Sequence, residues 1–378
     1  MERWWIWRGR LSGTTSSGSS LRSPAWASRW LRWFVQVGLF RGLLANASVT
    51  IDRAEADLWV TARNAPNVDL ASAFPETYVQ RVRSVPGVAR ADNLIVWVVR
   101  VTQPGGATED AVIYALEDFS RWGLPWSVEE GDPADLRRGK FVMIDESARK
   151  RFGGFAVGDH REFYGQRLKV IGRTSGALSF TTMPIAFVDY RVAQSMMRQE
   201  LQGRSTYILV KLAAGADPEW VREEIRHRLP HNDVWTRAEW AARSRAYWTD
   251  TTGLGLNMVM TVALGCFVGV VVVAQTLHTS TVEHLNEFAI IKAIGGRNAD
   301  VLAVIAKQAV IAAVLGFALG AVITYAARPV VANLDLKLDL SPEFAVTVFL
   351  GTLGLCLAAS AVSFRRVAGL DPAVVFRG

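Results

Sequence analysis

Two hydrophobic patterns divide the chain. In its C-terminal third, long uncharged apolar stretches occur at Gly253–Leu277, Gln308–Ala327 and Phe344–Phe364. A helix rises about 1.5 Å per residue and needs about 20 apolar residues to cross the roughly 30 Å hydrocarbon core of a bilayer. We therefore expect three membrane-spanning helices in this part of the chain.

Before these stretches, residues 50–250 show the shorter periods of a water-soluble domain. Helical spacing predicts helices at 75–84 and 218–228, and Asp217 precedes the second as an N-cap, with Pro218 at the first helical position. Runs of β-branched residues bounded by Gly, Pro or Asp predict strands at 94–101, 111–115, 141–144, 168–171, 185–188 and 207–210. We expect a large α+β domain of one or two lobes, followed by a helical transmembrane bundle.

Glycines in the first two apolar stretches are spaced four residues apart. Gly265 with Gly269, and Gly316 with Gly320, form two G-x-x-x-G patterns. Because glycine has no side chain, this spacing lets helix backbones approach closely in lipid. We predict that these four glycines are helix-packing positions in a bundle or a dimer.

Charges beside the apolar stretches predict their orientation. The residues after Phe364 carry three Arg against one acidic residue, whereas the loop at 328–343 carries two basic and three acidic residues. Positive residues favour the cytoplasmic side of a membrane. We therefore expect the tail at 365–378 and the connection at 278–307 in the cytoplasm, and the domain at 50–250 outside it. The chain would then be a multi-pass protein of the plasma (inner) membrane.

The start of the chain carries its charge excess. The whole sequence has a formal net charge of +7, and residues 1–41 hold seven Arg and one Glu, so the remainder carries only +1. This location gives no argument for nucleic-acid binding by the folded part. Residues 1–33 also hold six of the 14 Trp, and Arg with Trp is typical of a membrane interface. We interpret 1–33 as a basic Trp- and Ser-rich tail, which is either an anchor at the inner surface or a misassigned start.

A domain outside the membrane requires a first span or a signal before it. The best candidate, residues 33–47, has only 15 residues and is interrupted by Gln36 and Arg41. The first span is thus missing or degenerate, and a signal peptide ending near Ala45-Asn46-Ala47 is the alternative. We predict the following segments: tail 1–33, remnant of a first span 34–49, outer domain 50–250, span 251–277, cytoplasmic segment 278–307, span 308–327, outer loop 328–343, span 344–364 and tail 365–378.

Residue types used in catalysis and metal binding form no pattern in this sequence. Cys266 and Cys356 lie in apolar stretches, and the five His contain no H-E-x-x-H motif. The adjacent acids at 129–130 and 145–146 are predicted to be solvated surface charge. We therefore expect no enzyme, no metal site and no cofactor.

The connection between the first two apolar stretches predicts a short helix of its own. Ser280 and Glu283 fit a capping box, and apolar residues follow at helical spacing until Gly295-Gly296, a pair typical of a helix C-cap. An amphipathic helix at 281–294 is either a surface helix at the headgroups or a docking element for a cytoplasmic partner.

At this segment the sequence resembles a known family. The run Glu287–Gly295 resembles the signature of FtsX-like permeases, the membrane subunits of mechanotransmitting ABC transporters of the macrolide-exporter type. The residues at 369–373 and 84–88 are similar to further motifs of this family, and Tyr247-Trp248 with Thr252-Gly253 is similar to its DevC-type branch. The family places a span where this chain has its Arg-, Ser- and Trp-rich start.

The resemblance implies a concrete function. The chain would dimerise, and its MacB-like outer domain would move when a cytoplasmic ATPase subunit closes on ATP. ATP would be bound by that separate subunit, because this chain lacks a G-x-x-x-x-G-K-[ST] loop. A periplasmic adaptor and an outer-membrane channel would complete an exporter of lipids or similar amphiphiles. The residues implied in docking on the ATPase are Glu283, Leu285, Glu287, Phe288, Lys292, Ile294 and Gly295.

Two other functions stay open. The same architecture would serve a non-transporting mechanotransmission subunit that passes an ATPase movement to an extracellular partner. A membrane enzyme with a catalytic outer domain is the third alternative, but that domain shows no nucleophile elbow and no metal-ligand cluster.

Overall fold

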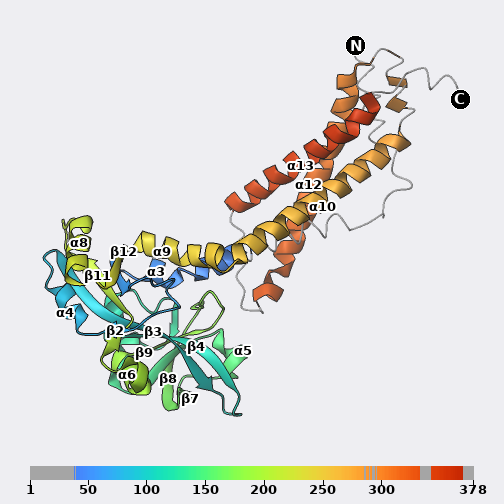
Figure 1. The fold of residues 1–378 in the computed structure, drawn as a ribbon. Coiled ribbons are helices and arrows are strands. Elements are labelled where there is room, and N and C mark those ends of the chain that lie inside the picture. Colours follow the sequence, from blue (N-terminus) through green and yellow to red (C-terminus); the bar gives the residue numbers. More distant parts are fainter. Residues whose placement is uncertain are drawn as a thin grey trace. The chain divides into compact units, whose positions relative to one another are not determined.

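The computed structural model of the 378-residue chain describes residues 40–284, 296–332 and 342–368, together with Gly38, Glu287, Phe288, Ile290, Ile291 and Ile294. These residues belong to two compact units (Figure 1). The first is the α+β domain, residues 40–257, and the second is the helical unit, which begins at Met258. The predicted tail at 1–33 lies outside the described residues.

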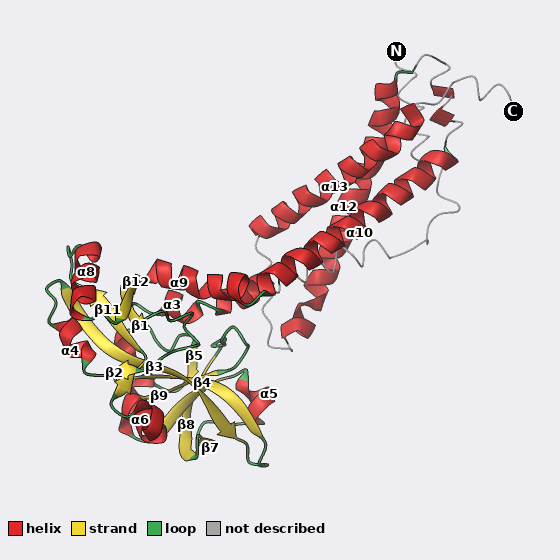
Figure 2. Cartoon of the chain, in the orientation of Figure 1, coloured by secondary structure: helices red, strands yellow, loops and turns green. Residues whose placement is uncertain are grey.

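A ten-stranded sheet forms the centre of the α+β domain (Figure 2). Its order is β12-β1-β11-β3-β4-β9-β6-β8-β5, and β7 pairs with β3 and β8. The pairs β4/β9 and β6/β8 are parallel, and the other pairs are antiparallel. The strands are β1 Leu58–Ala62, β3 Val88–Thr102, β4 Thr108–Leu116, β5 Val128–Glu130, β6 Phe141–Asp145, β7 His160–Phe163, β8 Gln166–Thr174, β9 Ile185–Asp189, β11 Tyr207–Leu212 and β12 Asn232–Thr236, and a separate pair is formed by β2 Phe74–Pro75 and β10 Arg204–Ser205.

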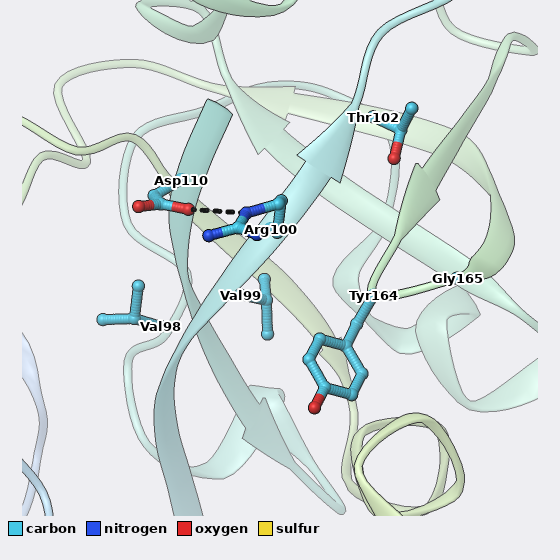
Figure 3. A pocket seen from close by; sticks show the side chains of 7 residues that line it. All are labelled: Val98, Val99, Arg100, Thr102, Asp110, Tyr164 and Gly165. Atoms are coloured by element: carbon cyan, nitrogen blue, oxygen red, sulfur yellow. Dashed lines mark ion pairs between the residues drawn. The ribbon is translucent and has the colours of Figure 1, made fainter. Parts of the chain in front are cut away.

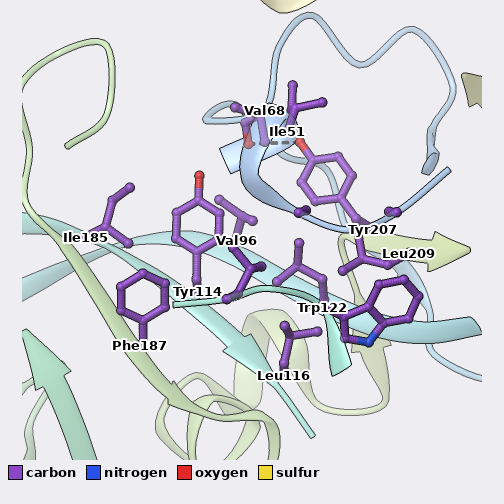
Figure 4. Close-up of a cluster of buried hydrophobic side chains, with 14 of the residues drawn as sticks. Ile51, Val68, Val96, Tyr114, Leu116, Trp122, Ile185, Phe187, Tyr207 and Leu209 are labelled. Carbon is purple, nitrogen blue, oxygen red and sulfur yellow. Dashed lines mark hydrogen bonds between the residues drawn. The ribbon is translucent and has the colours of Figure 1, made fainter. Parts of the chain in front are cut away.

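Successive side chains along a strand of this sheet enter different cores on its two faces. In β1, Trp59 enters one core, whereas Leu58 and Val60 enter another on the opposite face. This follows from the two-residue period of a strand. The core that contains Trp59 also holds Tyr114 and Trp122 (Figure 4). A third core lies under the odd-numbered residues of β3 from Ile95 onwards.

Short helices cover these cores. Helices α4 and α8 close the core of Leu58, α5 and α6 close the third core, and α3 and α9 close the core of Trp59. The helices are α3 Val49–Arg53, α4 Tyr78–Arg83, α5 Ala148–Phe152, α6 Tyr190–Met196, α7 Arg198–Leu201, α8 Pro218–Arg228 and α9 Arg237–Ala246. The domain is therefore α+β, as predicted.

The predicted elements of the domain are confirmed where their period is clear. Each of the six predicted strands lies within an observed strand. Helix α8 begins at Pro218, and the Asp217 carboxylate accepts a hydrogen bond from the Glu219 amide. Helix α4 begins only at Tyr78, because Phe74 and Pro75 pair with β10.

Three long helices are described in the helical unit: α10 Leu254–Glu283, whose first four residues still belong to the α+β domain, α12 Asn298–Ala332 and α13 Pro342–Ala368. Among the described residues, two stretches are long and apolar enough to cross a membrane, Leu254–Thr276 and Asn298–Ala326. The apolar part of α13, Ala345–Ala358, is shorter. A third span therefore stays a prediction.

Helices α12 and α13 pack against each other through small side chains. On α12 the buried positions include Ala309, Ala313, Gly316, Gly320 and Thr324. On α13 the buried positions recur every four residues, at Val348, Thr352, Cys356 and Ser360. Small residues at these spacings let the two backbones approach closely.

Candidate functional site: the coupling segment and the domain base

Helix α10 runs through the position where a new helix was predicted to start. Ser280, Thr281, Val282 and Glu283 are its last residues. The predicted capping box is therefore wrong. An N-cap residue acts only where the preceding backbone is not helical, and here the preceding residues already form a long helix. Glu283 is exposed at the end of α10.

Helical hydrogen bonds resume beyond α10, in residues 284–296, which we name the coupling segment. The Phe288 amide donates to the His284 carbonyl at 3.1 Å, and the Ile294 amide donates to the Ile290 carbonyl at 3.1 Å. The Gly296 amide donates to the Ile291 carbonyl at 2.8 Å, which is the six-to-one bond of a Schellman cap. A Cβ at Gly296 would lie 2.6 Å from the Ile291 carbonyl oxygen, so this position requires glycine.

The side chain of Phe288 does not lie at an open surface. It is 5% exposed and packs with Val301 and Ile305 of α12. Contact of Phe288 with the ATPase, which the resemblance implies, stays a prediction, and the ring already has a partner within the chain. Phe288 therefore holds the coupling segment on α12.

Other side chains of the coupling segment remain accessible. Ile290 is 43% exposed and Ile294 is 61% exposed. The Glu287 carboxylate is exposed and lies 3.1 Å from the His284 Nδ1 atom. The remaining predicted docking residues, Leu285, Lys292 and Gly295, lie outside the described residues.

The four predicted packing glycines divide into two groups. Gly316 and Gly320 lie on the buried face of α12, in line with Ala313. Gly269 is buried in α10, whereas a Cβ at Gly265 would meet no described atom within 4 Å. A packing role for Gly265 thus stays a prediction for contact with a second copy.

The part of the α+β domain from which the chain continues into α10 is held together by hydrogen bonds between polar groups. We name this part the domain base, residues 46–54, 64–70 and 240–252. The buried Ser244 hydroxyl donates to the Ala47 carbonyl and accepts from the Val68 amide. The Arg245 guanidinium donates to the Ser48 hydroxyl at 2.6 Å. The segment at 47, where the chain enters the α+β domain, and the segment at 244, near where it leaves, are therefore held together by hydrogen bonds.

A buried carboxylate lies within the domain base. Asp69 is 8% exposed, and its Oδ2 atom has no hydrogen-bond partner among the described residues. Burial raises the pKa of Asp69 to about 7, and a hydrogen bond from the Phe180 backbone acts in the opposite direction. Burial, and then the charge of Asp69, also raise the pKa of Tyr114 well above its ordinary value. Asp69 therefore changes charge near neutral pH.

Asp145 occupies a buried position, so the prediction of solvated charge is wrong for this residue. Its carboxylate is fully buried and accepts hydrogen bonds from the Ala177 amide at 2.7 Å and the Thr174 hydroxyl at 3.2 Å. The amide and hydroxyl of Ser147 donate to the same carboxylate. Burial raises the pKa of Asp145. This carboxylate joins the ends of β6 and β8, a role that a pair of adjacent acids does not reveal.

An open groove of about 510 Å³ lies beside the distal part of β3 (Figure 3). Its charged residues, Arg100 and Asp110, form an exposed ion pair at 3.7 Å. The Tyr164 hydroxyl at its rim donates to Glu200 at 2.9 Å, and this bond raises the pKa of Tyr164. No sequence pattern predicts this groove, because its sides come from β3, β4 and the β7–β8 turn.

Comparison with known families decides the class of the protein. Residues 34–228, just over half of the chain, match the MacB-like periplasmic core domain. Residues 259–372 match the FtsX-like permease C-terminal family. The chain belongs to the FtsX-like ABC transporter permeases with a MacB-like domain. This permease is accordingly an inner-membrane protein of a class that works with a cytoplasmic ATPase.

Relatives along nearly the whole length are permeases too. The permease is 26% identical over 349 residues to an uncharacterized ABC transporter permease of Mycobacterium tuberculosis, covering 91% of each chain. It is 24% identical over 346 residues to another from Mycobacterium bovis, again covering 91% of each chain.

Two solved structures are similar to part of the chain. The periplasmic region of MacB from Actinobacillus actinomycetemcomitans has a TM-score of 0.39 at 12% identity, covering 49% of this chain and 90% of that chain. The extracellular domain of the noncanonic ABC-type transporter YknZ from Gram-positive bacteria has a TM-score of 0.37 at 14% identity, covering 48% and 99%.

Proposed function

We propose that the permease couples a cytoplasmic ATPase to movement of its α+β domain outside the membrane, and thereby exports a lipid or another amphiphile. The observation that carries this proposal is the coupling segment. A short helical segment with two exposed isoleucines, Ile290 and Ile294, is fixed to the membrane helix α12 by the buried Phe288 ring.

The contacts of the coupling segment suit the transfer of force. A partner that binds Ile290, Ile294 and the Glu287 carboxylate would move the whole coupling segment. This segment ends in the hydrogen bond from the Gly296 amide and packs on α12 through Phe288. Helix α12 in turn packs on α13, and tightly packed elements move as units rather than deform. An ATPase movement would therefore reach the membrane helices without being absorbed by a flexible loop.

The rest of the assembly follows from the same proposal. The coupling segment would lie in the cytoplasm, α10, α12 and α13 would each span the membrane, and the α+β domain would lie outside. The permease would act as a homodimer without enzymatic activity of its own. Exposed apolar residues of α10 support contact with lipid or a second copy, among them Leu256, Val259, Leu264 and Phe267. A periplasmic adaptor and an outer-membrane channel would complete the export path.

Ile294 offers a sharper test of docking than Phe288. An Ile294→Asp exchange places a charge at a site that is 61% exposed, so folding should be retained while an apolar contact with the ATPase is lost. We expect the variant to insert into the membrane normally and to lose co-purification with the ATPase subunit. Trp220→Asp, at a position 52% exposed on α8, is the control and should co-purify normally. Full association of the Ile294 variant would refute the docking proposal.

A second function is favoured by the bonded domain base. Ser244 and Arg245 hold the incoming and outgoing chain together, so the domain base would move as one piece. Such a movement would also change the state of an extracellular partner without transport of a solute. Reconstitution of the permease with its ATPase in lipid vesicles separates the two. ATP-dependent transfer of a lipid supports export, whereas an ATP-dependent domain movement without transfer supports regulation.

A further inference from the structure

The connection between β8 and β9 folds back as a small hairpin, residues 177–185. The Ile185 amide donates to the Ala177 carbonyl at 2.9 Å, and the Ser179 amide donates to the Met183 carbonyl at 3.0 Å. Phe180 lies at the tip of this hairpin and is only 5% exposed. A hairpin tip with a buried aromatic ring must have a partner elsewhere in the domain.

That partner is Trp248. The rings of Phe180 and Trp248 stack with centroids 4.1 Å apart and an interplanar angle of 13°. The hairpin has two further attachments: the Phe180 backbone hydrogen-bonds to Asp69, and the Arg151 guanidinium donates to the Thr182 hydroxyl at 2.9 Å. The hairpin therefore joins the β8–β9 part of the sheet to the domain base.

Trp248 lies where the chain leaves the domain. Helix α9 ends at Ala246, and Tyr247–Thr251 form a π-helical turn before α10 starts at Leu254. Gly253 between them has φ of +71°, a left-handed conformation that interrupts the helix. A Cβ at Gly255 would lie 2.3 Å from the Thr249 carbonyl oxygen, so the turn folds closely over the start of α10.

Without a contact to another part of the domain, the junction between α9 and α10 would bend when α10 moves. A π-helical turn and a left-handed glycine interrupt the hydrogen-bond ladder that makes a continuous helix stiff. We propose that the Phe180–Trp248 stack gives this support, so that Phe180 and Trp248 are positioning residues through which the α+β domain follows the movement of α10. This inference rests on the proposed coupling function. It names the contact within the α+β domain through which that coupling would act.

Hydrogen exchange of the full permease, alone and in complex with its ATPase, tests the inference. In Phe180→Ala, the amides at 247–257 should exchange about tenfold faster than in the wild type, because a stacked aromatic pair stabilises its surroundings by about that factor. In the wild-type complex, addition of ATP should change exchange in hairpin 177–185. This response should be lost in Phe180→Ala and in Trp248→Ala, whereas ATP hydrolysis and ATPase binding continue.

Conservative and matched variants make the result specific. Phe180→Tyr and Trp248→Phe keep a stacked pair and should keep the ATP response. Phe155→Ala removes a ring of the same type and similar burial, 4% exposed, from a core that does not contain Trp248. It should keep the response as well, and the double variant of Phe180 and Trp248 should behave like either single one.

The outcomes separate this inference from the proposed function. A wild-type complex whose domain does not respond to ATP would overturn the coupling function and the stack's role with it. A wild-type response that persists in both alanine variants would overturn the stack alone. Loss of the response in Phe155→Ala to the same degree would also overturn it, because the effect would then be general destabilisation.

Discussion

The α+β domain packs one of its cores around Trp59, Trp122 and Trp240, which are fully buried, whereas most of the buried positions of α12 and α13 are Ala, Gly, Ser or Thr, and one ring pair, Phe317 with Phe349, joins these two helices. In water, burial of large apolar side chains drives folding, so bulky rings are used. Between helices in lipid that force is absent, and close backbone approach supplies the contact instead. The two units thus differ in the size of the side chains at most of their buried positions.

The largest effect should follow from removing a ring of the aqueous core. Trp122 is fully buried, stacks with Arg90 and donates from Nε1 to Asp92 at 3.0 Å. Trp122→Ala should lower the free energy of unfolding of the domain by about 3–5 kcal/mol, measured by hydrogen exchange of β3 and β4 in the full chain. Trp220→Ala, at a position 52% exposed, should change it by less than about 0.5 kcal/mol. Equal effects would contradict the assigned core.

A buried charge should make the stability of the domain base depend on pH. The pKa of Asp69 is raised from 3.8 to about 7, so the folded state binds its proton more tightly than the unfolded state. Stability should therefore fall as pH rises from about 4 to about 7 and level off above, with a cost of up to about 4 kcal/mol. Asp69→Asn should remove this dependence and stabilise the base most at pH 8, as read from amide exchange at 64–70. A stabilisation independent of pH would refute the assignment.

The helix pair should respond to the opposite change, a larger side chain. Ala313 is buried between α12 and α13, and Ala318 is exposed on the same helix. Ala313→Leu should separate the helices and destabilise the pair by about 1–3 kcal/mol, whereas Ala318→Leu should be nearly neutral. Detergent-induced unfolding of the full chain in micelles measures both. If Ala318→Leu were the more damaging change, the assigned packing face would be wrong.

The smallest effect separates a true capping box from a false one. The Thr236 hydroxyl accepts from the Glu239 amide at 3.3 Å, and the Glu239 carboxylate accepts from the Thr236 amide at 3.0 Å. Thr236→Ala should cost about 1 kcal/mol in the stability of α9. Ser280→Ala should cost nothing, because residue 280 is inside α10 and alanine favours helix. Exchange rates of the two helices provide the measurement.

Sequence reasoning succeeded where the pattern is long and regular. The predicted strand at 94–101 lies within β3, and the apolar stretch from Gly253 lies almost wholly within α10. It missed β1 and β12, which are short and pair with each other across distant parts of the chain. Strand β12 begins with Asn232 and Asp233, residue types that are depleted in strands, and β1 is buried on both faces and so shows no alternation of polar and apolar residues.

The helix predicted at 281–294 agrees with the structure at its end and not at its start, and its docking role stays a prediction. The coupling segment ends at the predicted glycine pair, since Gly296 is needed for a local backbone contact with Ile291. The burial of Phe288 and the solvent exposure of Ile294 depend on the position of α12, and a local sequence pattern does not predict that position. The π-helical turn at Tyr247–Thr251 was not anticipated either.

The division into an α+β domain and apolar helices, and the family, could be predicted from the sequence alone. These follow from composition, periodicity and short motifs, which are properties of neighbouring residues. The burial of Asp145, the packing of Phe288 on α12 and the stack of Phe180 on Trp248 could be learned only from the three-dimensional structure. Those contacts join residues far apart in the sequence, and their formation depends on the packing of the whole unit around them.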